Sequence, residues 1–268
     1  MKREPAVAGY FYSDNPRELK FHLSTLIKFK ENKIKAKGII VPHAGYMYSG
    51  WVAGKVYGSI IPPDTAIIIG TNHTGLGEKI SLFPGEAFIT PLGETLVDKE
   101  LTEDLTKSVP LLSKDVMAHL HEHSIEVQVP FLQYINPEVK IVPLCLSKLD
   151  LKEVMELGKG IAEVVKKHPD KYILIVGSSD FSHYVPHEVA KKKDLMAIKE
   201  ILNLSEENFL KTIYEENISA CGYIPIAVTI NACKNLGASK AELVEYQTSG
   251  DIIKDYYSVV GYGGIVIY

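Results

Sequence analysis

The sequence predicts an α/β protein in three layers, with helices covering both faces of a mostly parallel central sheet. Short apolar runs rich in β-branched residues, at 38–41, 66–69 and 172–176, are typical of buried parallel strands. Segments with helical spacing separate these runs along the chain. No repeat, low-complexity segment or flexible linker interrupts the 268 residues, so we expect a single domain over residues 1–268.

The first helix is expected directly after Asn15, which is a favourable N-cap, with Pro16 in the first helical position and Glu18 completing a capping box. The run 38–41 ends at Pro42 and is too short for a helix, which favours a strand. The other elements predicted in this half are a helix at 51–61, a strand at 66–69, and a hairpin at 86–97 that turns at 91–93.

The second half of the chain repeats the alternation of helices and strands. A long helical pattern stops before Pro169, and the strand that follows stops at Gly177. The predicted helices span 124–135, 151–167, 187–202, 206–214 and 223–236. The predicted strands span 140–146, 172–176, 241–247 and 258–268. This alternation favours the parallel sheet.

The composition excludes several classes of protein. Apolar residues make up 46% and charged residues 23%, a balance too apolar for a disordered chain. The net charge of −4 supplies no excess of cations for phosphates, which argues against a nucleic-acid partner. No apolar stretch reaches the ~18 residues of a membrane span, and residues 10–14 interrupt any signal peptide. Three cysteines make no disulfide framework, so we expect a cytoplasmic protein.

Histidines follow the carboxyl ends of the three most apolar predicted strands. These histidines are His43, His73 and His183. In open α/β sheets, ligands bind in the crevice beyond the carboxyl ends of the strands. A lone histidine at such a position can be purely structural, but three together indicate a functional site.

The residue types at these strand ends indicate a transition metal. Neutral imidazole binds Fe, Cu, Zn and Ni well, and it rarely serves Mg²⁺ or Ca²⁺. Asp180 precedes His183 in the same segment, so one of the two could ligate or orient while the other acts as a base. The alternative for Asp180 is that it only caps the turn after the strand.

Cys221 is the candidate thiol of the site. It lies just before the apolar helix predicted at 223–236, where the positive end of the helix dipole is expected to lower the pKa of the thiol and favour the thiolate. Cys145 lies inside a predicted strand and Cys233 inside that helix, so both are expected to be inert core residues.

A fourth candidate cluster lies at residues 119–126. It lacks the His-Glu-x-x-His spacing of a zinc protease, and it is expected to open the helix that starts near Ser124. We expect Glu122, His123 and Glu126 to line the pocket or to support its ligands. His119 and His121 are expected at the surface.

Six short motifs occur in order along almost the whole chain. They are PAVAGYFY at 5–12, PHAGY at 42–46, GTNH at 70–73, EHSIE at 122–126, SSDFSHY at 178–184, and Cys221-Gly222. This set resembles the MEMO family, whose prokaryotic members are also called AmmeMemoRadiSam system protein B. The resemblance implies a fold similar to class III extradiol dioxygenases of the LigB type.

The resemblance also implies a ligand set. It places metal ligation at His43, His73 and Cys221, with His183 at the position of the dioxygenase catalytic base and Asp180 beside it. Dioxygenases of that fold hold iron with two histidines and a carboxylate, and here Cys221 stands in place of the carboxylate. The metal is therefore expected to be Fe²⁺ or Cu, with Zn²⁺ as a third candidate.

Three functional hypotheses follow. The leading one is a mononuclear metal-dependent redox or dioxygenase-like enzyme acting on a small-molecule substrate. The second is a metal-free thiol hydrolase in which Cys221 attacks and His183, oriented by Asp180, acts as base. The third is a non-catalytic pocket that binds an anionic or phosphotyrosine-like group of a peptide ligand. Neither a nucleic acid nor a membrane is expected as partner.

Overall fold

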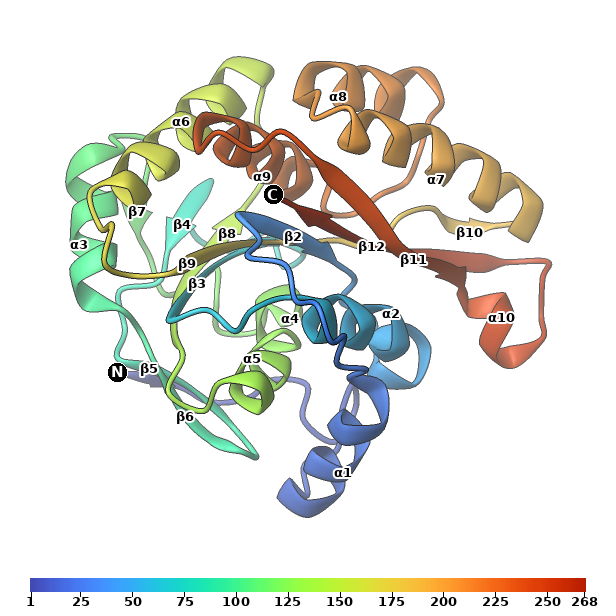
Figure 1. The fold of residues 1–268 in the computed structure, drawn as a ribbon, viewed down its shortest axis with the longest axis horizontal. Coiled ribbons are helices and arrows are strands. Elements are labelled where there is room, and N and C mark those ends of the chain that lie inside the picture. The colour runs from blue at the N-terminus through green and yellow to red at the C-terminus, as the bar shows by residue number, and fades with distance from the viewer.

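A computed structural model describes residues 1–268, and its centre is a nine-stranded sheet between two layers of helices (Figure 1). The strands of this sheet are β2 (Gly38–Val41), β3 (Thr65–Thr71), β4 (Ile80–Leu82), β7 (Ser113–Lys114), β8 (Lys140–Leu146), β9 (Ile173–Ser178), β10 (His183–Val185), β11 (Ala241–Thr248) and β12 (Val259–Ile267). Their order is β10-β12-β2-β9-β3-β8-β4-β7, with β11 paired to β12. A second sheet joins β1 (Lys2–Arg3), β5 (Ala87–Thr90) and β6 (Gly93–Leu96).

The four central strands, β2, β9, β3 and β8, are parallel, as the sequence predicted. Gly177 of β9 pairs with Ile40 of β2 on one side and with Ile69 of β3 on the other. These strands are almost wholly buried, because helices cover both faces, which is why they read as continuous apolar runs. Their carboxyl ends therefore lie side by side at one edge.

The outer strands make the sheet mixed rather than mostly parallel. β12 is antiparallel to β2, β10 and β11, and β4 is antiparallel to β8. β11 and β12 follow one another with only the short helix α10 (Ser249–Ile253) between them, and a short connection joins antiparallel strands only. The expectation of a mostly parallel sheet therefore holds for its centre and fails at its edges.

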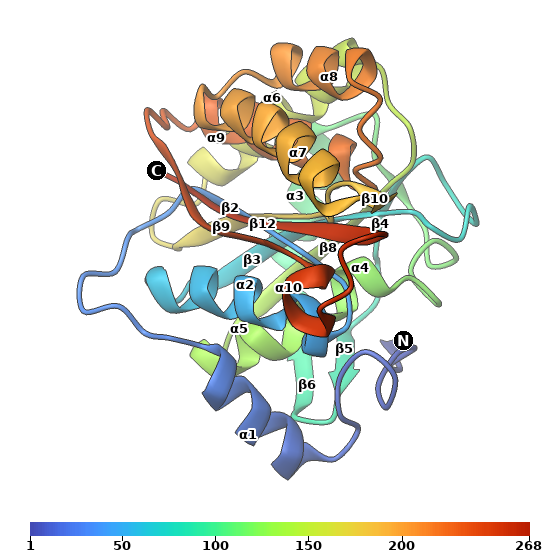
Figure 2. The same ribbon diagram turned by 90° about the vertical axis from the view of Figure 1, so that its right-hand side faces the viewer.

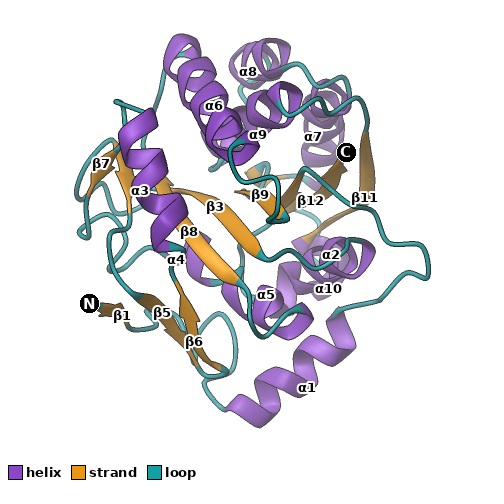
Figure 3. Ribbon diagram, turned by 60° about the vertical axis from the view of Figure 1, so that its left-hand side comes forward, coloured by secondary structure: helices purple, strands orange, loops and turns teal.

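Helices cover the two faces of the large sheet separately (Figures 2 and 3). The helices on one face are α6 (Leu151–Lys166), α7 (His187–Leu202), α8 (Glu206–Glu215) and α9 (Tyr223–Asn235). The helices on the other face are α1 (Pro16–Leu26), α2 (Tyr46–Ser59), α4 (His123–Glu126) and α5 (Val129–Ile135). Ile67 and Ile69 of β3 join the first core, and Ile68 between them joins the second. None of the helices combines the length and the apolar composition that crossing a membrane would need.

The helix predicted at 51–61 is α2, which begins at Tyr46. Gly50 lowers the helix propensity just before the predicted start, so the first turn of the helix was not predicted. Gly50 and Gly54 let α2 approach the end of α1 closely, since a Cβ on Gly54 would lie 2.3 Å from the carbonyl oxygen of Leu26. Tertiary packing therefore fixes a helix that local propensity leaves weak.

The helix predicted at 124–135 is wrong as a single element, because it divides into α4 and α5. Pro130 has no amide hydrogen to continue the helical hydrogen bonds of α4. Gln128 stands at the break, and its buried side chain donates to the carbonyl of Pro42 and to the hydroxyl of Ser178. The break thus brings a polar side chain to the ends of β2 and β9.

Two capping details also differ from the prediction. Asn15 caps α1 as expected and accepts from the amide of Arg17 at 2.9 Å. Glu18, however, accepts from the hydroxyl of Ser13 at 2.9 Å, so the reciprocal half of the capping box does not form. A further helix, α3 (Lys99–Ser108), was not predicted, although Asp98 caps it through the amide of Leu101.

Candidate metal centre

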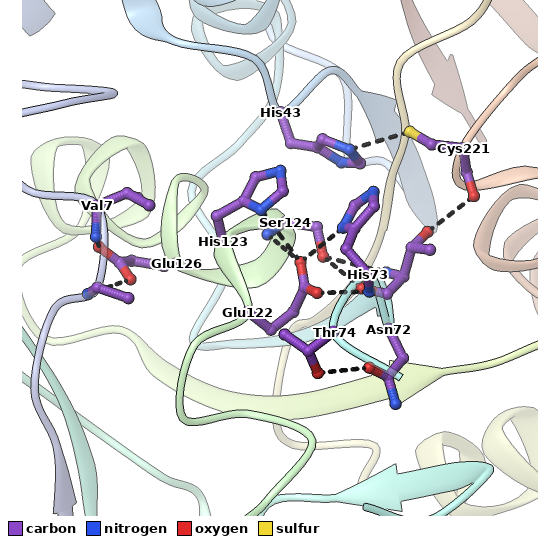
Figure 4. Close-up of polar contacts among 12 residues, drawn as sticks. Val7, His43, Asn72, His73, Thr74, Glu122, His123, Ser124, Glu126 and Cys221 are labelled. Atoms are coloured by element: carbon purple, nitrogen blue, oxygen red, sulfur yellow. Dashed lines mark hydrogen bonds and ion pairs between the residues drawn. The ribbon is translucent and has the colours of Figure 1, made fainter. Parts of the chain in front are cut away.

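The candidate site lies where the central strands end and α9 begins (Figure 4). His43 and His73 follow β2 and β3, and Cys221 directly precedes the Gly222 that caps α9. Asp180 and His183 follow β9, which lies between β2 and β3. Adjacent parallel strands end at the same edge, so residues far apart in the sequence meet there.

The geometry of His43, His73 and Cys221 fits a single ion. Their donor atoms all lie within 4.8 Å of one another, and Sγ of Cys221 is 3.0 Å from Nε2 of His43. Donors bound to one tetrahedral ion at 2.0–2.3 Å lie roughly 3.3–3.7 Å apart. Only small side-chain adjustments therefore separate this arrangement from a coordination shell.

His43 is held in one tautomer by Ser178. The Ser178 hydroxyl donates to the carbonyl of Ser124 at 2.7 Å, so it can only accept from Nδ1 of His43, 3.0 Å away. The proton is therefore on Nδ1, and the lone pair of Nε2 points to Cys221. Burial and the neighbouring His123 and His73 hold the pKa of His43 well below its usual value, so the ring is neutral, as ligation requires.

His73 is held by Glu122 in the same tautomer. The carboxylate accepts from the backbone amide of His73 at 2.8 Å and from its Nδ1 at 2.9 Å. Burial alone would raise the pKa of Glu122, but the hydrogen bond and charge of His73, the charge of His123 and the amide of Ser124 lower it to about 2. Glu122 is thus an ionised acceptor that orients a histidine, the usual arrangement behind a metal ligand.

Cys221 differs from its prediction in one respect. The helix N-terminus was expected to lower the pKa of the thiol, but burial, followed by the charge of Asp180, raises it. The residue as a whole is only half-buried, but burial of its sulfur disfavours the charged thiolate. A metal ion binding here must therefore displace a proton from the thiol. Cys145 and Cys233 are buried in the core, as expected.

Asp180 and His183 reach the site but do not bind each other. Asp180 accepts from the backbone amide of His43 at 2.8 Å, and burial raises the pKa of its carboxyl. His183 donates from Nδ1 to the carbonyl oxygen of Ser219 at 2.9 Å, which leaves its Nε2 free. Asp180, His183 and Cys221 form a second group of donors within 4.8 Å.

The cluster at 119–126 divides between the site and the core. The ring of His123 stacks on that of His73 with centroids 4.6 Å apart, so it lines the candidate site. Glu126 does not, because it is fully buried in an ion pair with Arg3 and also accepts from the hydroxyl of Tyr12. His119 is not at the surface either: it is 1% exposed, with Nε2 bonded to Ser81.

Three supporting residues were missed by sequence reasoning, namely Ser178, Gln128 and Ser219. Ser178 lies in the same strand-end segment as Asp180, so its position was a usable signal. Gln128 and Ser219 carry no local signal, because only the folded chain brings them to His43 and His183.

A hollow of about 640 Å³ between α1, the β5–β6 turn and α5 contains none of the site residues.

Comparisons with known proteins agree with the motifs. The family described as Memo-like protein matches residues 3–266. A MEMO1 family protein of Aquifex aeolicus is 44% identical over 266 residues, covering 98% of each chain. MEMO1 family protein MmarC5_0191 of Methanococcus maripaludis is 43% identical over 285 residues, covering 100% of each.

A solved structure shares the fold. The crystal structure of uncharacterized protein JW3007 from Escherichia coli K12 matches with a TM-score of 0.53 at 13% identity, over 84% of this chain and 98% of that one. At this identity the likeness concerns the fold alone. The family match and the relatives, which extend over nearly the whole length, show that this chain belongs to the Memo family.

Proposed function

We propose that this chain is a mononuclear transition-metal enzyme that carries out redox or dioxygenase-like chemistry on a small organic substrate. The observation that carries the proposal is the common orientation of two imidazoles. His43 and His73 each donate Nδ1–H to a buried acceptor, which leaves both Nε2 lone pairs for one ion beside the Cys221 thiol.

The donor set favours particular metals. Two neutral imidazoles and one thiolate suit Fe²⁺ or Cu, and they also suit Zn²⁺. Such an ion supplies Lewis acidity and, if it is iron or copper, electron transfer. Three protein donors leave a coordination position open, which a catalytic site requires and a structural site does not.

His183 is the proposed general base or acid. Its Nδ1 is occupied by the Ser219 carbonyl, so the free Nε2 can take a proton from a substrate and return it. Asp180 has a positioning role, because it binds the backbone amide of His43 rather than the ring of His183. His123 lines the substrate side through its contact with His73.

The test is metal analysis of protein purified without added metal or chelator. We expect close to one transition-metal ion per chain by mass spectrometry, and we expect the substitution Cys221→Ser to remove most of it. Cys145→Ala, at a buried cysteine outside the site, is the matched control and should retain the ion. A folded wild-type chain that takes up none of Fe²⁺, Cu⁺ or Zn²⁺ would contradict the proposal.

A thiol hydrolase is the second candidate, because Sγ of Cys221 lies 3.0 Å from Nε2 of His43. The base would then be His43 rather than His183. Hydrolysis of p-nitrophenyl acetate that survives complete metal removal, and that His43→Ala abolishes, would favour this candidate. A peptide ligand with a phosphotyrosine-like group is the third, and it would occupy the same pocket without turnover.

A further inference from the structure

A small cavity adjoins the candidate metal centre at Cys221. Its volume is about 150 Å³, and it lies between the carboxyl ends of β3 and β8 and the first residues of α9. Its polar lining consists of Thr71, Asn72, Ser147, Lys148, Cys221 and Tyr223. The cavity is thus separate from the imidazole cluster but shares one metal-ligand residue with it.

The charge of this cavity is positive and uncompensated. Lys148 is exposed and takes part in no ion pair, and no aspartate or glutamate lines the cavity. Lys148 also lines a neighbouring hollow that contains the carboxylates of Asp150, Glu153 and Glu207, but it forms an ion pair with none of them. Two other lysines of that hollow are paired, Lys79 with Glu153 and Lys211 with Glu215. Lys148 is therefore an ammonium group without a carboxylate partner beside the candidate site.

The remaining polar groups narrow the choice of ligand. The side chains of Thr71 and Asn72 are already bonded within the protein, to the carbonyl oxygens of Cys221 and Leu76. Ser147 has no hydrogen bond from its hydroxyl, so it can serve a ligand together with Lys148. One ammonium group and one hydroxyl match the single charge of a carboxylate better than a phosphate, which is usually held by more donors.

The size of the cavity agrees with this choice. A volume of about 150 Å³ is about five times the ~30 Å³ that a water molecule occupies in the liquid. It therefore admits a carboxylate with a few attached atoms. Tyr223 forms one wall, and its ring contacts that of Tyr214 at 5.9 Å, so an aromatic or other apolar body can lie against it.

We propose that this cavity is a subsite for the carboxylate of a small organic acid and that Lys148 binds its charge. The proposal rests on the proposed function, because the acid is a substrate only if Cys221 and the two histidines hold an ion. It assigns the substrate class of that centre. The carboxylate lies at Lys148, and the rest of the molecule extends past Cys221 to the open coordination position.

The test compares benzoate with its neutral analogue benzamide by titration calorimetry on metal-loaded and metal-free protein. We expect benzoate to bind the wild-type chain more tightly than benzamide, and Lys148→Met to weaken benzoate roughly fivefold without affecting benzamide. Lys148→Arg should restore most of the benzoate affinity. Lys152→Met, at an exposed lysine of α6 outside the cavity, is the matched control and should behave as wild type.

Equal affinities of the wild-type chain for benzoate and benzamide would overturn the subsite. An equal loss of benzoate affinity in Lys148→Met and Lys152→Met would overturn it as well. Metal content measured on the same samples separates this failure from that of the proposed function. Lys148→Met should keep its ion while losing benzoate. A wild-type chain that binds benzoate through Lys148 but takes up no ion would leave an anion site and overturn its assignment to a metal-centre substrate.

Discussion

The site contains two combinations of an imidazole and a carboxylate, and only one of them forms a hydrogen-bonded pair. His73 and Glu122 are 49 residues apart, yet Nδ1 of His73 lies 2.9 Å from the carboxylate. His183 and Asp180 belong to one short segment, yet they share no hydrogen bond, and a backbone carbonyl holds His183 instead. The pKa of Glu122 is lowered, and that of Asp180 is raised.

Under the proposed function, this difference separates a metal ligand, His73, from a proton-transfer group, His183. An ionised carboxylate behind His73 fixes its ring and strengthens it as a donor, which suits permanent ligation. His183 lies on the short edge strand β10, where the register shifts between His183 and Val185, and its ring is only half-buried. A less constrained imidazole that keeps Nε2 free suits an exchange of protons with a substrate.

The largest expected effect is on metal content. His73→Ala should lower the bound metal to below roughly one-tenth of the wild-type ratio, because losing a ligand costs more than the 10–100-fold of a supporting residue. His183→Ala should retain nearly all of it. Both variants are compared after identical loading and after circular dichroism shows that they are folded. Equal losses in the two would make His183 a ligand and remove the distinction.

The second effect concerns stability in acid, measured by urea unfolding of metal-free protein. The pKa of Glu122 is lowered to about 2 in the folded protein. Its ionised carboxylate therefore contributes fully to the free energy of unfolding above the pKa of about 4.3 that it has in the unfolded chain, and this contribution is lost as the pH falls toward 2. Glu122→Gln should therefore cost on the order of 3 kcal/mol at pH 7 and about half of that at pH 3.

Asp180 should show the opposite sign. Its pKa is raised, so ionisation costs stability as pH rises above the unfolded value near 3.9. Asp180→Asn keeps an oxygen for the amide of His43 and should match or exceed the stability of the wild type at pH 8. A parallel pH dependence of the two variants would show that the carboxylates are not in contrasting environments.

The smallest effect concerns the backbone beside His183. Tyr184 has a φ of 58°, a left-handed conformation that costs a non-glycine residue about 1–2 kcal/mol. Relief of this strain in Tyr184→Gly should raise the free energy of unfolding. The net gain should be only about 0.5–1 kcal/mol, because glycine also increases the conformational entropy of the unfolded chain. Asn217→Gly, at a φ of 50°, is the control and should change little, because asparagine tolerates this region. A loss of stability in Tyr184→Gly would show that side-chain contacts outweigh the strain.

Features that depend on residues close together in the sequence were predictable, and features that depend on distant residues were not. The strand ends at His43 and His73 were predictable, because β-branched runs mark buried strands and parallel strands share an edge. The start of α2 was not, because close packing on Leu26 rewards glycines that local propensity penalises. Glu126 was assigned to the pocket by its neighbours in sequence, whereas Arg3, 123 residues away, decides its place in the core.

The sequence by itself determined the family, the parallel centre of the sheet, and the placement of histidines and Cys221 at element ends. Only the tertiary structure decided what each of these groups can do. The tautomer of His43 depends on Ser178, and the support of His73 depends on Glu122. The reason is physical: periodicity and turn chemistry act between neighbours in the chain, whereas the proton on a nitrogen and the pKa of a buried group depend on which distant segment lies within hydrogen-bonding distance.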